Sequence, residues 1–194
     1  RHQDKYRSLA LSSVTTHDLP PTAGYLYGEH IALRDRLGLL IRDTETENSE
    51  DLAWQNRILA RIGEYGLFDG TALDGHDFDG AARDERGDIT DLLVAMHRYI
   101  AGTPSALTCT SLVDMVGDIK AQNQPGTTHD LYPNWCIPLC DATNTPILIH
   151  DLPALPLFRA VAEASGGGNC GVLLGLGCVR SLYTVRSENE RFWT

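Results

Sequence analysis

The hydrophobic and polar positions at the start of the chain predict a buried strand, a loop and a helix. Residues 9–14 are short, largely apolar and bounded by polar residues, as in a buried strand. Pro20 and Pro21 end strand pairing, because proline has no backbone N–H to donate. From Thr22 to Leu40, apolar residues recur at roughly helical intervals. We therefore predict one helix directly after the two prolines.

The same periodicity predicts two more helices. Residues 43–51 are acidic and polar, and we expect a solvated connection there, leading into a helix with an apolar face from Leu52 to Tyr65. Residues 69–87 mix glycines with many charges and predict a surface loop. Asp88 is placed to cap a helix over residues 89–101.

The second half of the chain predicts another strand and a closing helix. Residues 107–112 are short and rich in threonine, which is typical of a strand. Residues 147–149 predict a third, edge-like strand, and residues 157–164 a short helix. Strands that alternate with helices favour the α/β class. A β/α barrel takes about 250 residues for eight units, and we identify two strands of that type, so we expect an incomplete barrel.

Composition narrows the partners and the compartment. A net charge of −10 opposes binding to nucleic acid or anionic lipid, and no apolar run approaches the length of a membrane span. The first residues lack a secretory signal and an initiator Met, so we expect a longer chain upstream of Arg1. The 5 cysteines are odd in number and scattered, which favours a reduced, cytoplasmic setting over a disulfide framework.

His17-Asp18 stands where the first strand gives way to a loop. In β/α barrels the catalytic side chains gather at the carboxyl ends of the strands. An aspartate there could act as an acid or base, bind a metal or hold sugar hydroxyls. The alternative is structural: Asp18 or Thr22 could cap the following helix.

A second group of polar residues begins at Gln122. Pro125-Gly126 predicts a tight turn, since glycine adopts positive φ without strain. Amides beside such a turn can bind hydroxyl groups, and Trp135 could stack on a sugar ring. The alternative is an ordinary turn with a core tryptophan.

Together these segments resemble the amylomaltases, a family of 4-alpha-glucanotransferases. The resemblance covers residues 5–160, with the motifs in the family's order. The matching runs are Thr15-Thr-His-Asp-Leu-Pro-Pro-Thr-Ala-Gly-Tyr25, Met96-His-Arg-Tyr-Ile-Ala101, Thr103-Pro-Ser105, Ser111-Leu-Val-Asp-Met-Val-Gly-Asp118, Gln122-Asn-Gln-Pro-Gly-Thr127 and Tyr132-Pro-Asn-Trp135.

The resemblance implies the carboxyl-terminal part of a (β/α)8 TIM-type barrel of the α-amylase clan over residues 1–160, and a divergent, poorly ordered tail over 161–194. Family members transfer a segment of an α-1,4-glucan to the 4-hydroxyl of an acceptor, through a covalent intermediate and without a metal or organic cofactor. Asp18 matches the third catalytic carboxylate and His17 a substrate-binding histidine. Asn123 and Gly126 match the loop that lines the donor side. The nucleophile and the acid/base are expected upstream of Arg1, so the isolated chain should be inactive.

The sequence departs from the family at Cys136, where an arginine is common. Asp114 and Asp118 are expected to be structural. The glycines of residues 173–178 lack the pattern of a nucleotide-binding loop.

Three other functions remain as alternatives. One is a metal-dependent phosphohydrolase that uses His17-Asp18 with further histidines. Another is a zinc-stabilised module built from Cys136 and Cys140 with His129 or His150. The last is a glucan-binding module without catalysis.

Overall fold

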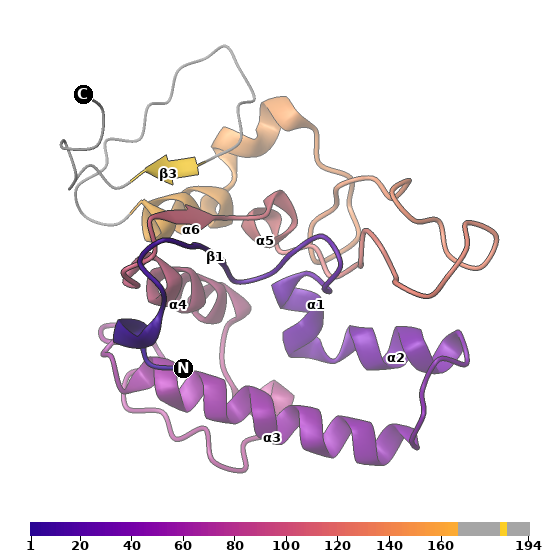
Figure 1. The fold of residues 1–194 in the computed structure, drawn as a ribbon, viewed down its shortest axis with the longest axis horizontal. Helices are drawn as coiled ribbons and strands as arrows, with labels where there is room; N and C mark the ends of the chain where they lie inside the picture. The colour runs from indigo at the N-terminus through magenta and orange to yellow at the C-terminus, as the bar shows by residue number, and fades with distance from the viewer. Residues whose placement is uncertain (167–182, 186–194) are drawn as a thin grey trace.

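A computed structural model describes residues 1–166 and the strand at 183–185 (Figure 1). The elements in chain order are η1 (Gln3–Lys5), β1 (Leu11–Ser13), α1 (Thr22–Tyr27), α2 (Glu29–Arg36), α3 (Thr44–Gly63), η2 (Arg83–Glu85), α4 (Ile89–Ala101), β2 (Leu107–Cys109), α5 (Leu112–Val116), η3 (Ile149–Ala154), α6 (Pro156–Ser165) and β3 (Tyr183–Val185). The tail predicted from residue 161 begins inside α6, and its residues 167–182 and 186–194 lie outside the described part.

The sheet has the order β1-β2-β3. Strand β1 pairs in parallel with β2, with Leu11 opposite Leu107 and Ser13 opposite Cys109, and β3 pairs antiparallel to β2. The predicted strands at 9–14 and 107–112 are therefore confirmed, although both are shorter than expected. Helix α4 lies between the sheet and α3 (Figure 1). Because β1 and β2 are parallel and joined through helices, the predicted α/β class is confirmed.

The helix predicted from Thr22 to Leu40 is wrong as a single element. It is divided into α1 and α2 at Gly28, which has φ 80° and donates its N–H to the carbonyls of Gly24 and Tyr25. Glycine reaches this left-handed conformation at little cost, so it ends one helix and begins the next.

The predicted connection at 43–51 is also wrong, because α3 already begins at Thr44. The Asp43 carboxylate accepts a hydrogen bond from the Thr46 N–H at 2.8 Å and caps the helix. Acidic residues are favourable in a first helical turn, where they face the positive end of the helix dipole. The run of charges therefore belongs to the helix itself.

The later predictions are mixed in outcome. Helix α4 is confirmed, with the Asp88 carboxylate accepting from the Thr90 N–H at 2.6 Å, and α6 is confirmed as the closing helix. The prediction of a strand at 147–149 is wrong. An isolated bridge between Cys140 and Pro146 lies just before these residues, and η3 begins at Ile149. Pro146 has no N–H to extend the ladder.

Among the described residues, two groups of buried side chains form the core, and the 69–87 loop contributes to the larger one. Phe78 and Leu73 of this predicted surface loop are 2 % exposed and pack with Leu59 of α3 and Leu92 of α4. The smaller group joins Ala23, Leu93, Met115 and Val161. In the described part of the chain, no helix is both long and apolar enough to cross a bilayer.

Candidate active site

The loop that carries Asp18 begins where β1 ends and is closed by its own hydroxyl groups. The Ser13 hydroxyl donates to the Thr15 carbonyl at 2.5 Å, and the Thr15 hydroxyl to the Pro20 carbonyl at 2.9 Å. Pro21 then leads into α1. These bonds place Asp18 at the carboxyl end of the strand, as the sequence predicted.

Asp18 contacts two of the predicted site residues. Its carboxylate accepts from Asn123 Nδ2 at 2.8 Å, and His17 Nε2 lies 3.2 Å from its second oxygen. The Asp18 side chain remains 56 % exposed and that of His17 68 % exposed. The structure therefore brings His17, Asp18 and Asn123 together and leaves the carboxylate open to solvent.

Asp18 does not cap α1. The cap position is Pro21, and the first helical N–H, that of Thr22, donates to the Asp114 carboxylate at 2.7 Å. The helix-cap interpretation of Asp18 and Thr22 is therefore wrong. Asp18 therefore has no helix-capping role at α1.

Asn123 precedes a turn that Asn134 holds in shape. Gly126 has φ 84°, and the Thr127 N–H donates to the Gln124 carbonyl at 3.3 Å, which closes a turn around Pro125-Gly126. The Asn134 side chain accepts from the Gln124 N–H at 2.7 Å and donates to the Thr127 hydroxyl at 2.9 Å. Gly126 thus shapes the turn through its backbone.

Trp135 lies beside His17, and the alternative of a core tryptophan is wrong. Its side chain is 60 % exposed, and its ring centroid is 5.6 Å from that of His17. Its φ of 64° is rare for a bulky residue and is held by a hydrogen bond from its N–H to the Gln122 carbonyl at 2.8 Å. An exposed aromatic ring therefore adjoins the His17-Asp18 pair.

Comparison with known proteins identifies the family. Residues 1–143 match the glycoside hydrolase 77 family, described as 4-alpha-glucanotransferase. The chain belongs to the 4-alpha-glucanotransferase family. It is 42 % identical over 161 residues to the 4-alpha-glucanotransferases of Mycobacterium bovis and Mycobacterium tuberculosis, which covers 83 % of this chain and 20 % of each relative.

A solved structure agrees with this family. The crystal structure of amylomaltase from Corynebacterium glutamicum matches with a TM-score of 0.80 and 55 % sequence identity, over 85 % of this chain and 23 % of that one. The predicted resemblance to the amylomaltases is thus confirmed. The chain spans about a fifth of the length of the curated relatives that it matches.

Asp18 lines a hollow of about 580 Å³. Asn123 and Pro125 line the hollow, as do Tyr25 and His30, which the family resemblance did not suggest as substrate-binding residues. A second hollow of about 500 Å³ is lined by His17, Trp135 and the ends of both parallel strands. Asp18 thus lines one hollow and His17 the other.

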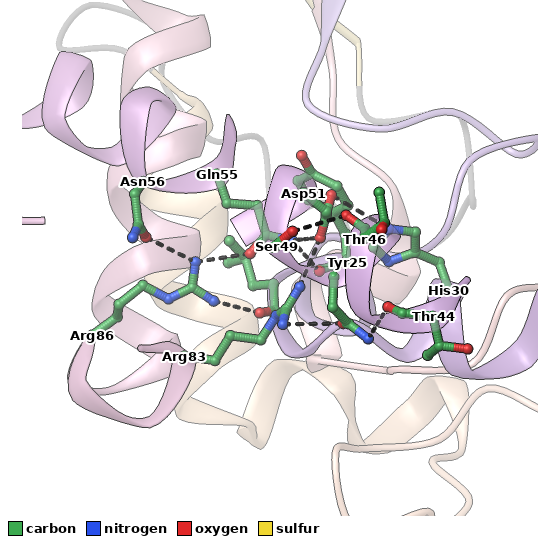
Figure 2. Close-up of polar contacts among 12 residues, drawn as sticks. Tyr25, His30, Thr44, Thr46, Ser49, Asp51, Gln55, Asn56, Arg83 and Arg86 are labelled. Atoms are coloured by element: carbon green, nitrogen blue, oxygen red, sulfur yellow. Dashed lines mark hydrogen bonds and ion pairs between the residues drawn. The ribbon is translucent and has the colours of Figure 1, made fainter. Parts of the chain in front are cut away.

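A polar network centred on α3 holds Tyr25 and His30 in place (Figure 2). The Asp51 carboxylate lies 3.5 Å from His30 Nε2 and accepts from Arg83 at 2.8 Å. Gln55 donates to Asp51 at 2.7 Å and to the Tyr25 carbonyl at 2.6 Å. Burial, assisted by the charge of Asp51, raises the pKa of Tyr25 to about 12, so its phenol ionises only at strongly alkaline pH.

The metal-dependent alternatives lack a suitable cluster in the part of the chain that the structure describes. Residues 1–166 bring no three His, Cys, Asp or Glu side chains into a group that could hold a metal ion. Cys136, Cys140 and Cys109 are free thiols. The phosphohydrolase interpretation requires the His-Asp pair to lie on a helix. His17-Asp18 lies in a loop instead.

Proposed function

We propose that this chain carries one part of the active site of a 4-alpha-glucanotransferase. The enzyme would transfer a segment of an α-1,4-glucan to the 4-hydroxyl of another glucan or of glucose. The observation that carries the proposal is the hydrogen bond from Asn123 to Asp18 at 2.8 Å, which joins the two motifs across 105 residues. Membership of the family supports the same activity.

Asp18 would act by its charge. In a retaining glycosyl transfer, positive charge develops on the sugar ring in an oxocarbenium-like transition state. An ionised carboxylate that grips the ring's hydroxyls binds this state more tightly than the ground state, and thereby lowers the barrier. His17 and Asn123 would orient Asp18 and share the hydroxyls, while Gly126 shapes the loop on the donor side.

The nucleophile and the acid/base would come from outside residues 1–194. The parallel pair β1 and β2 fits the carboxyl-terminal part of a (β/α)8 barrel over residues 1–160. We place the remaining strands and both missing carboxylates in the rest of that barrel. The chain's match to about a fifth of its relatives' length supports this placement.

A neutral glucan suits the surroundings of Asp18. The two hollows of about 580 and 500 Å³, one lined by Asp18 and the other by His17, are each large enough for a sugar ring. Free thiols at Cys109, Cys136 and Cys140 favour a cytoplasmic location. The chemistry calls for no cofactor.

Replacing Asp18 in the natural protein that contains this chain tests the proposal. Asp18→Asn keeps the shape but removes the charge, and we expect kcat for maltotriose disproportionation to fall about 100- to 1,000-fold. Asp84→Asn, at an exposed position in η2, is the matched control. Full activity of Asp18→Asn would refute the role of Asp18.

The isolated chain gives a second test. Incubated with maltotriose, purified residues 1–194 should release neither glucose nor longer maltodextrins, because the proposal places the nucleophile and the acid/base outside these residues. Clear disproportionation would show that the chain is sufficient by itself.

A further inference from the structure

Two buried carboxylates contact the segments that flank Asp18 and Asn123 in the chain. Asp114 belongs to α5, and Asp118 follows the end of this helix; both are 0 % exposed. Burying an ionised carboxylate costs several kcal/mol unless hydrogen bonds and opposite charges compensate. The partners of each carboxylate therefore indicate what it does.

Asp114 holds the end of the Asp18 loop. One of its oxygens accepts from the Thr22 N–H at 2.7 Å, and the other from the Thr22 hydroxyl at 2.8 Å. Thr22 is the first residue of α1, where N–H groups have no partner within the helix. The oxygen that accepts from the Thr22 hydroxyl also lies 3.5 Å from Nε2 of His97 in α4. Asp114 thus joins the Asp18 loop to α5 and α4.

Asp118 holds the start of the Asn123 loop. It accepts from the Lys120 N–H at 2.9 Å and from the Cys140 N–H at 3.1 Å. Burial raises the pKa of Asp118 above its usual range, although these two amides oppose the shift. The carboxylate thus fastens the chain just before Asn123 to the segment at Cys140.

The helix that follows the Asp18 loop also packs against the segment that precedes the Asn123 loop. A Cβ atom added to Gly24 of α1 would lie 2.2 Å from the carbonyl oxygen of Ile119. The helix that follows Asp18 therefore packs directly on the backbone that precedes Asn123. A shift of either Thr22 or Lys120 would be passed on to the Asp18–Asn123 contact.

We propose that Asp114 and Asp118 are positioning residues. They set the geometry of Asp18 and Asn123 through the loops that carry these two residues. Both side chains are fully buried and line neither hollow, and they contact the two loops through Thr22 and Lys120. Structural need alone does not explain two such groups, since well-packed apolar residues commonly stabilise a core as well as buried charges do. A transition-state contact, in contrast, depends on fixed geometry. This inference rests on the proposed role of Asp18.

The experiment uses the natural protein that contains this chain and replaces Asp114 and Asp118 separately with alanine. We expect kcat for maltotriose to fall about 10- to 100-fold, with KM changed little, because a misplaced Asp18 loses mainly transition-state contact. Amide hydrogen exchange should accelerate at residues 15–19 in Asp114→Ala and at residues 120–126 in Asp118→Ala. Ile62→Val, a core change in α3, controls for loss of stability alone.

A conservative pair guards against misfolding of the alanine variants. Thr22→Val removes the hydroxyl donor to Asp114, and Thr22→Ser retains it, so kcat should fall further in the valine variant. Equal kcat values for this pair, or loop exchange no faster in the alanine variants than in Ile62→Val, would overturn the positioning role. Faster loop exchange in a protein that shows no glucan transfer even when unsubstituted would support positioning and overturn the proposed function.

Discussion

Asn123 donates a hydrogen bond to the Asp18 carboxylate at 2.8 Å, although 105 residues separate the two in sequence. The donor comes from the loop after α5 and the acceptor from the loop after β1. The two loops meet because β1 and β2 are parallel neighbours, whose carboxyl ends lie at the same edge of the sheet.

Removing this donor tests the contact. In the natural protein, Asn123→Ala should lower kcat about 10-fold, since a partly exposed hydrogen bond to a charged group contributes about 1–2 kcal/mol. Asn123→Asp should cost more, because a second negative charge would face Asp18. Steady-state kinetics with maltotriose measure both variants. A smaller loss in Asn123→Asp than in Asn123→Ala would contradict the observed pairing.

The sequence predicted those elements whose signals are local. Strands β1 and β2, the Asp88 cap and helix α6 follow from short apolar runs, a capping residue and helical periodicity. The break at Gly28 was missed because apolar residues continue at helical spacing on both sides of it. The start of α3 was missed because an acidic first turn and a solvated connection have the same composition.

The candidate site was predictable in part. His17, Asp18 and Asn123 were predicted from the order of their motifs, and the structure places them together. Tyr25 and His30 were not, because Asp51 and Gln55 that fix them lie in a helix of their own and leave no local pattern. Long-range packing decides such contacts, and periodicity does not encode it.

The close approach of α1 to Ile119 predicts that Gly24 tolerates no side chain. In Gly24→Ala the added Cβ would lie 2.2 Å from a backbone oxygen, so the helix must move. We expect the free energy of unfolding to fall by about 1–3 kcal/mol, as in overpacked cores. Chemical denaturation measures the change.

Gly63 provides the control for Gly24. It also lies in a helix, but a Cβ there would meet only Phe68 at 3.7 Å, an ordinary contact. Gly63→Ala should leave stability unchanged or raise it by up to about 1 kcal/mol, because alanine favours the helix. Equal destabilisation by both changes would argue against the packing of α1 on Ile119.

Arg86 is expected to be essential for stability. It is 1 % exposed and donates to the Leu26 carbonyl at 2.5 Å and to Gln55 at 2.8 Å (Figure 2). Arg86→Met would leave both acceptors without this donor, and we expect a loss of about 2–3 kcal/mol in the free energy of unfolding. Arg42→Met, which breaks exposed ion pairs with Glu47 and Glu50, should cost under about 1 kcal/mol. Urea denaturation of the two variants compares them directly.

Stability should decline at alkaline pH because of two tyrosines, Tyr99, which is buried, and Tyr25, which is partly buried. Burial raises the pKa of Tyr25 and of Tyr99 to about 12, above the usual value of 10.0. Both phenols are neutral in the folded and unfolded states well below pH 10. Between pH 10 and pH 12 the unfolded chain loses these protons first, so unfolding becomes easier as the pH rises.

Denaturation midpoints measured from pH 8 to about pH 11.5 check this alkaline decline. Tyr25→Phe removes one titrating group, so the fall with pH should be shallower in this variant than in the unsubstituted protein. Tyr27→Phe is a weaker test of the same kind, since Tyr27 is 49 % exposed and its pKa is raised by a less complete burial. An alkaline decline that is as steep in Tyr25→Phe as in the unsubstituted protein would show that Tyr25 does not titrate with folding.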